Sequence, residues 1–227
     1  MNNAVNPASG TPISACLRCG TCCEKGGPAF HLEDRLLIEN GTIPSGCLYT
    51  IRKGELARDN VKQCLVPVDA DIIKIKGKKG GWACMFFDDI RKSCTIYKNR
   101  PLECRALKCW DPRKLEKIYA ANRLTRKDLI SQVQGLWGLV EDHQARCDYV
   151  IIQRLVRDLD GGAAEPARRE LSEIIRYDDE IRKLVVSRGG LEPDMLDFVF
   201  GRPLVVTIEN YGIKARRLAA GWKGQSR

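Results

Sequence analysis

The sequence lacks the patterns on which many nucleotide-binding, hydrolytic and membrane proteins depend. No apolar run approaches the roughly 18 residues needed to span a bilayer. There is no Walker loop, no GxGxxG turn and no GxSxG nucleophile turn. Histidine occurs only twice, and aromatic residues make up 7% of the chain. We therefore expect neither a membrane span nor a member of these enzyme classes.

The start of the chain also lacks a secretion signal. Residues 1–15 are polar and have neither the basic start nor the apolar stretch of an export signal, so we expect a flexible lead-in and a cytoplasmic protein. The last segment, residues 214–227, is basic and contains glycine, and we expect it to form a tail. A chain of 227 residues with 44% hydrophobic residues allows one sizeable core or two small ones.

The residue that the chain has in excess is cysteine. It contains eleven, and ten of them precede Asp111. The count is odd, an export signal is missing and the spacing is of the CxxC type, which together favour metal binding in a reducing compartment over a disulfide framework. This uneven distribution predicts a metal-binding domain over residues 16–110 and a second domain over residues 111–213.

The strongest local motif is Cys16-x-x-Cys19-x-x-Cys22-Cys23. Two cysteines separated by two residues can point both sulfurs at one ion, while the amides between them donate hydrogen bonds to the thiolates. Gly20 permits the sharp backbone turn that this requires. Because adjacent cysteines cannot easily aim at the same ion, one of Cys22 and Cys23 can serve a second site. We predict metal ligation by this group.

A second group of four cysteines follows later in the chain: Cys84, Cys94, Cys104 and Cys109. The first two are expected on neighbouring strands, where the geometry of a hairpin would bring them close together in space. We predict that all four ligate metal. The alternative is that they are buried structural thiols.

Three cysteines and both histidines remain outside these groups. Cys147 lies on the apolar stripe of an expected helix, as a buried core thiol would. The roles of Cys47 and Cys64 stay open. His31 and His143 lack ligand-like spacing, and we expect capping or surface roles for them.

The fold class that these patterns predict is α+β. The first domain is expected to be small and irregular, with a helix over residues 31–40 and a short antiparallel meander of strands over residues 72–76, 82–87 and 94–97. So small a domain can hardly supply a large apolar core, and metal ligation is the usual remedy.

The second domain is expected to be an α-helical bundle. Asp111-Pro112 can start one helix, and Thr125 with Asp128 forms a capping box for the next. Apolar residues then recur at helical spacing up to a break at Gly161-Gly162, and a further helix is expected to end at Gly189-Gly190.

The combined cysteine pattern resembles a known family, the YkgJ-type CxxCxxCC cysteine-cluster family, over about residues 16–110. The matching residues, in chain order, are Cys16-x-x-Cys19-x-x-Cys22-Cys23, Cys84-Met85-Phe86, Cys94-Thr95-Ile96-Tyr97-x-x-Arg100-Pro101-x-x-Cys104-Arg105 and Cys109. That family is described as a zinc- or iron-chelating domain and includes relatives of flagellin lysine N-methylase. The resemblance implies metal binding; it implies no particular reaction and does not extend to the helical domain.

Three residues of the matching motif other than cysteine are candidates for binding the cofactor. Arg100 and Arg105 lie close to cysteines in the sequence, where fixed positive charge would stabilise an anionic site. Tyr97 could donate a hydrogen bond to a sulfur. The alternative is that Tyr97 belongs to the core and that both arginines form surface salt bridges.

The spacing leaves the metal open, because four thiolates suit zinc and a [4Fe-4S] cluster equally well. A bacterial ferredoxin or a radical S-adenosylmethionine loop would need a cysteine where the chain has Gly26. We favour an iron–sulfur cluster, most simply [4Fe-4S], over zinc, since eight clustered cysteines are more than a small domain needs for structural stabilisation by metal.

Three functional hypotheses follow. The first is a cytoplasmic metal-cluster protein that transfers electrons or assists or matures a partner protein, with the helical half as the docking surface. The second is an S-adenosylmethionine-dependent protein lysine methyltransferase, which the family's methylase relatives suggest. The third is a zinc-stapled adaptor or nucleic-acid-binding module, although aromatic residues are too sparse to suggest base stacking. Whether the protein is an enzyme, and its oligomeric state, stay open.

Overall fold

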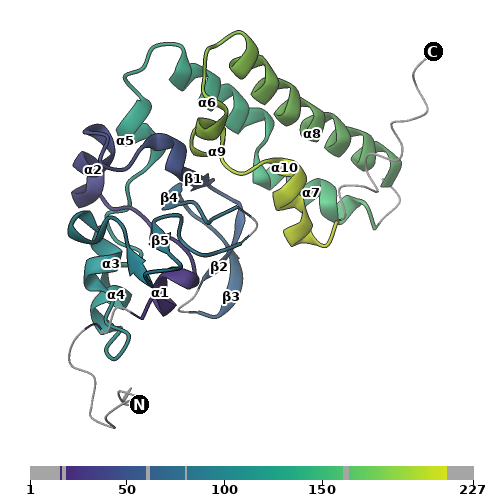
Figure 1. Cartoon of the computed structure of the whole chain (residues 1–227). Coiled ribbons are helices and arrows are strands. Elements are labelled where there is room, and N and C mark those ends of the chain that lie inside the picture. Colours follow the sequence, from purple (N-terminus) through teal and green to yellow (C-terminus); the bar gives the residue numbers. More distant parts are fainter. Residues whose placement is uncertain (1–15, 17–18, 60–61, 80, 161–163, 214–227) are drawn as a thin grey trace. The chain divides into compact units, whose positions relative to one another are not determined.

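The structure is a computed structural model that describes residues 16, 19–59, 62–79, 81–160 and 164–213 (Figure 1). The expected lead-in, the break at Gly161-Gly162 and the basic tail lie outside the described residues. The chain divides into two compact units. The cysteine unit consists of Met1–Leu48 and Ile73–Leu124, and the helical unit of Tyr49–Ile72 and Thr125–Arg227. The domain boundaries expected at residues 15, 110 and 213 stay predictions.

The cysteine unit is built from short elements. In chain order they are α1 (Thr21–Glu24), the 3₁₀ turn η1 (Leu32–Asp34), α2 (Arg35–Glu39), η2 (Ser45–Cys47), β4 (Ile72–Ile75), β5 (Phe87–Asp88), β6 (Ser93–Cys94), η3 (Tyr97–Asn99), α3 (Leu102–Ala106) and α4 (Arg113–Ile118). The helical segment expected over residues 31–40 is present as η1 followed by α2, and Gly41, with φ +75°, follows it.

The core of the cysteine unit forms around an extended segment at Phe30. The Phe30 amide donates to the Ile73 carbonyl at 2.9 Å, and the Phe30 carbonyl accepts from the Leu124 amide at 3.0 Å. Phe30, Ile73 and Leu124 are all completely buried. Three separated stretches of chain thus meet at one residue, which gives the cysteine-bearing loops a fixed base.

The strands of the cysteine unit differ from the expected meander. β5 and β6 form an antiparallel pair with Phe87 opposite Cys94 and Asp88 opposite Ser93. The segment expected as a strand over residues 82–87 contributes only an isolated bridge between Gly77 and Cys84 before β5 begins. The reason is a long-range contact: the Cys84 amide donates to the carbonyl of Cys23 at 2.7 Å, so it does not continue a ladder toward β6.

The helical unit contains the longer helices that the apolar spacing predicted. They are α5 (Arg126–Ile130), α6 (Leu136–Arg146), α7 (Tyr149–Asp158), α8 (Ala164–Ser187), η4 (Pro193–Met195), α9 (Leu196–Val199), α10 (Leu204–Thr207) and η5 (Ile208–Tyr211). The capping box that starts α5 is present, because both Thr125 and Asp128 make the predicted bonds. Helices α7 and α8 pack against each other (Figure 1). No helix among the described residues is long and apolar enough to cross a membrane.

Three short strands precede these helices: β1 (Leu48–Ile51), β2 (Leu56–Asp59) and β3 (Cys64–Pro67). β2 and β3 form an antiparallel pair in which Leu56 lies opposite Pro67 and Asp59 lies opposite Cys64. With its small antiparallel sheets followed by helices, the protein has the predicted α+β fold.

Candidate metal centre

The backbone that carries the first cysteines of the motif turns sharply at Gly20. Gly20 has φ +82°, a left-handed conformation that an L-residue adopts only at a cost, and α1 begins immediately after it. Its carbonyl accepts from the amides of Cys23 and Glu24 at 2.8 and 3.0 Å. A Cβ atom at this position would lie 2.3 Å from Cζ of Phe87, so glycine is also the residue that fits. The sharp turn predicted at Gly20 is present.

Two cysteines from the second group lie next to this turn. The backbone bond between Cys84 and Cys23 joins α1 to the segment that precedes β5. Cys94 sits on β6 opposite Phe87, the residue whose ring fills the space at Gly20. Cys84 is buried, and Cys23 and Cys94 are half-buried. Residues about sixty to seventy positions apart in the sequence are therefore brought to one place by backbone pairing.

Helix α3 carries Cys104 and is anchored at its first turn. The carboxylate of Asp34 accepts from the Leu102 amide at 2.8 Å, and that of Glu103 accepts from the Ala29 amide at 2.7 Å. These two contacts tie α3 to the segment around Phe30. Cys104 is half-buried on the helix that they hold.

The thiols of this region influence each other electrostatically. Burial, followed by the charges of Cys84, Cys94 and Cys22, raises the pKa of Cys104 to about 12. The Sγ atoms of Cys22 and Cys23 lie 4.0 Å apart, and the hydrogen bond between them lowers the pKa of Cys22 to about 6 and raises that of Cys23. A site at which thiol charges repel one another is stabilised by a cation that they share.

Cys109 interacts electrostatically with the cysteines at the beginning of the motif. Burial raises the pKa of Cys109, and the charges of Cys19, Cys16 and Cys22 raise it further. Cys19 lies 3.4 Å from the hydroxyl of Thr21, a hydrogen bond that lowers the pKa of its thiol. The electrostatic neighbours thus cross the two sequence groups: Cys109 has Cys16, Cys19 and Cys22 as neighbours, whereas Cys84 and Cys94 neighbour both Cys22 and Cys23.

Arg100 and Tyr97 stand beside these thiols as a stacked pair. The guanidinium carbon of Arg100 lies 3.6 Å from the centre of the Tyr97 ring. Burial raises the pKa of Cys94, and the positive charge of Arg100 opposes this rise. The buried Nε of Arg100 has no hydrogen-bond partner among the described residues. Its fixed charge therefore lies near the thiol of Cys94, and binding of the cofactor by Arg100 and Tyr97 stays a prediction.

Arg105 is placed differently. It donates to the carbonyl of Arg100, and its Nη2 lies 3.5 Å from Oδ1 of the fully buried Asp34. These are the contacts of the salt-bridge alternative. Binding of the cofactor by Arg105 stays a prediction.

Comparison with known families agrees with this geometry. Residues 15–128, half of the chain, match the family model CxxCxxCC, described as a "putative zinc- or iron-chelating domain". The chain belongs to the CxxCxxCC family. No curated protein and no solved structure matches it. The matched segment contains all eight predicted ligands, and all eight belong to the cysteine unit.

The donor set of this CxxCxxCC protein fits the metals named for its family. Thiolates bind both zinc and iron–sulfur clusters, and all eight candidate ligands are cysteines. The residues that would hold a metal are the cysteines of the α1 turn together with Cys84, Cys94, Cys104 and Cys109, and this ligand set stays a prediction. The protein is a cysteine-rich domain of the zinc- or iron-chelating type.

The remaining cysteines are distributed over both units. Cys47 is half-buried at the end of η2, where its carbonyl accepts from the Lys76 amide at 2.9 Å. Cys64 is exposed on β3 of the helical unit. Cys147 is completely buried in the apolar core of that unit, as predicted.

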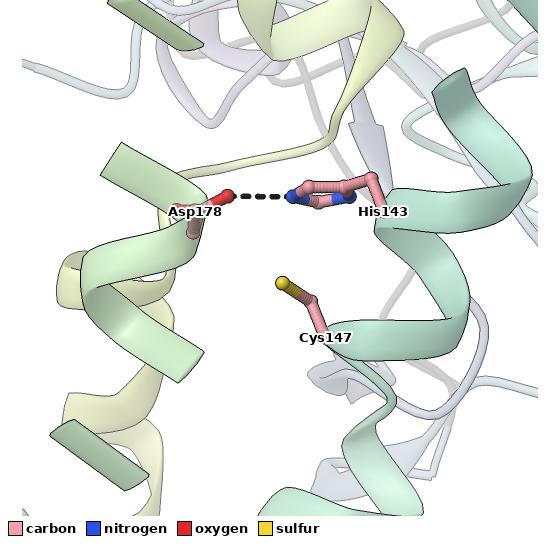
Figure 2. A group of neighbouring side chains, drawn as sticks. All are labelled: His143, Cys147 and Asp178. Carbon is pink, nitrogen blue, oxygen red and sulfur yellow. Dashed lines mark hydrogen bonds and ion pairs between the residues drawn. The ribbon is translucent and has the colours of Figure 1, made fainter. Parts of the chain in front are cut away.

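The histidine predictions had opposite outcomes. His31 is the N-cap of η1 and forms a capping box with Asp34, as expected. A surface or capping role for His143 was wrong, because it is completely buried between α6 and α8, where Nε2 bonds Oδ1 of Asp178 at 2.7 Å (Figure 2). The available signal was its position four residues before Cys147 on the same apolar stripe.

His143, Cys147 and Asp178 could in principle hold a metal, since their ligand atoms lie within 4.8 Å of one another (Figure 2). Asp178, however, already accepts from Arg182 Nε at 3.0 Å and from the Leu204 amide at 2.9 Å. A metal on Nε2 of His143 would also move the proton to Nδ1, which is buried and has no partner among the described residues. We therefore assign the trio to the hydrogen-bonded core.

Proposed function

We propose that this protein carries iron–sulfur clusters of the [4Fe-4S] type in the cytoplasm and uses them to transfer electrons, or to assist or mature a partner protein. The observation that carries the proposal is the convergence of cysteines from distant segments within one compact unit. Eight thiols exceed the four that one structural zinc ion needs. When bound, such a cluster accepts and releases single electrons.

The neighbours of each thiol suggest how the eight ligands divide. Because Cys22 and Cys23 are adjacent, each is assigned to a different site. The Cys23 carbonyl contacts Cys84, which supports a first site of Cys23, Cys84, Cys94 and Cys104. The electrostatic neighbours of Cys109 support a second site with a different ligand set: Cys16, Cys19, Cys22 and Cys109.

Groups of the chain around the two sites have separate roles in this proposal. Arg100 supplies positive charge that offsets the thiolates, and Tyr97 fixes the plane of its guanidinium. Asp34 and Glu103 hold α3, and with it Cys104, in position. The helical unit supplies the surface for the partner protein.

Metal analysis of protein purified without oxygen tests the proposal. Two [4Fe-4S] clusters predict about eight iron and eight sulfide per chain, with visible absorption that bleaches on reduction. Zinc is the second candidate because the family description names it, and it predicts a colourless protein with about two zinc ions per chain. Stoichiometric zinc without sulfide would refute the iron–sulfur proposal. Loss of one cluster in Cys84→Ser and of the other in Cys109→Ser would support the ligand partition.

A further inference from the structure

Two short hairpins of the cysteine unit lie side by side. The Trp82 hairpin, residues 77–84, is described apart from Gly80 and is closed by a bridge between Gly77 and Cys84. The Ile90 hairpin, residues 87–94, is the β5–β6 pair. The ammonium group of Lys78 on the first hairpin forms an ion pair with Asp89 on the second. The Phe87 amide also donates to the Cys84 carbonyl at 2.9 Å, so the backbone holds the two turns next to each other.

Each hairpin exposes one large apolar side chain. Trp82 is 75% exposed and Ile90 is 94% exposed. A tryptophan and an isoleucine of this exposure leave most of their apolar surface in water, so burying both against one further surface would be favourable. Two such side chains on adjacent turns form a paired apolar feature that a single exposed residue does not.

The charge of the protein is concentrated in the same unit. The cysteine unit contains 17 Lys and Arg and 9 Asp and Glu, a formal charge of +8, whereas the helical unit contains 21 and 20, a formal charge of +1. Two metal sites of about −2 each would still leave the cysteine unit at about +4. A basic unit with apolar tips is complementary to an anionic, partly apolar surface.

Cationic side chains flank both apolar tips. Lys79 is exposed on the Trp82 hairpin, and Arg91 and Lys92 are exposed on the Ile90 hairpin. Lys92 lies 3.3 Å from Glu24 and Arg91 lies 3.9 Å from Asp88, but such exposed pairs are weak and can exchange partners. The tips and cations thus form a small amphipathic surface of the cysteine unit.

We propose that the Trp82 and Ile90 hairpins dock the protein onto the surface of an anionic membrane. Trp82 and Ile90 enter the headgroup region, and Lys79, Arg91 and Lys92 contact lipid phosphates and carboxylates. Tryptophan favours this interface, and basic residues are attracted to anionic leaflets. A protein partner would need a broad contact of about 800 Å² on each side, whereas single side chains on two turns suit insertion into lipid.

Vesicle binding by the full-length, metal-loaded protein tests the proposal. We expect co-sedimentation with vesicles of phosphatidylcholine and phosphatidylserine, weaker binding at high salt, and little binding to phosphatidylcholine alone. The double variant Trp82→Ser/Ile90→Ser should bind about tenfold or more weakly, since it removes both apolar anchors. Val150→Ser is the matched control, because Val150 is 68% exposed on the helical unit and should not affect binding.

Several outcomes would overturn the proposal: no binding of the metal-loaded protein to anionic vesicles, equal binding to neutral vesicles, or unchanged binding by the double variant. Self-association that depends on Trp82 and Ile90 would assign the tips to a second copy of the chain instead. Ile90→Ser alone serves as a second variant, because a side chain that is 94% exposed contributes little to folding. Metal content, measured in parallel, should equal that of the wild type, so failure of docking is distinguished from failure of metal binding.

Discussion

Replacing Gly20 by alanine should damage the cysteine unit by two separable effects. The first is backbone strain, because φ +82° costs an L-residue about 1–2 kcal/mol. The second is overlap, since the new Cβ would lie 2.3 Å from Cζ and 2.5 Å from Cε2 of Phe87. Phe87 is almost completely buried, so relieving the overlap by repacking should cost about 1–3 kcal/mol more. The expected total is about 2–5 kcal/mol.

Gly41→Ala is the matched control for this prediction. Gly41 lies in the same unit at φ +75°, but a Cβ atom there would meet nothing within 4 Å. Gly41→Ala should therefore be destabilised by backbone strain alone, about 1–2 kcal/mol. The free energy of unfolding of both variants can be measured with urea, together with the metal bound per chain. We expect lower metal content only in Gly20→Ala, because Gly20 begins the turn that carries Cys22 and Cys23.

Equal destabilisation by the two substitutions would refute the reasoning, since it would mean that the contact with Phe87 carries no free energy. Adding Phe87→Leu gives a further check. In the Gly20→Ala background it should recover part of the lost stability by removing the overlapping ring atoms, whereas in the Gly41→Ala background it should only destabilise.

Three further predictions follow from single contacts. Cys104→Ser should lose metal while Cys147→Ser keeps the full amount; half the metal in the latter would contradict its assignment to the core. Burial lowers the pKa of His143 from 6.5 to about 4. The unfolded chain therefore binds this proton at a higher pH than the folded protein does, and the free energy of unfolding should fall by roughly 3 kcal/mol as the pH falls from 6.5 to 4. Urea unfolding at several pH values should show a smaller fall for His143→Gln. Thr125→Ala should cost about 1 kcal/mol by removing the α5 cap, whereas an unchanged urea midpoint would count against the capping box.

Features set by neighbouring residues were predictable from the sequence. The capping box of α5 requires only Thr125 and Asp128, and the tight turn before α1 requires only Gly20. The helices of the second unit follow from apolar spacing, because burial of one face selects the 3.6-residue period. Family membership was equally visible, since the spacing of the cysteines is itself the motif.

Features set by long-range contacts were not predictable. The segment at residues 82–87 has strand-like residues, but the Cys84 amide bonds Cys23 instead of extending a sheet. The i, i+4 relation of His143 to Cys147 points to the apolar stripe, but the hydrogen bond that fixes its ring is made to Asp178, 35 residues later. In both cases the partner that decides the structure lies outside the window from which a local pattern can be inferred.

The same distinction explains why the sequence indicates the ligands but not their partition. Spacing brings Cys22 and Cys23 into one turn, whereas their proposed division between two sites rests on which distant segments approach each of them. Cys84 reaches this turn through the backbone of Cys23, while Cys109 takes its electrostatic neighbours from Cys19 and Cys16. A metal at the first site would therefore join three distant segments of the unit, and one at the second would join the start of the motif to its end. Metal binding and completion of the fold should then be a single event, as expected for a unit with so small an apolar core.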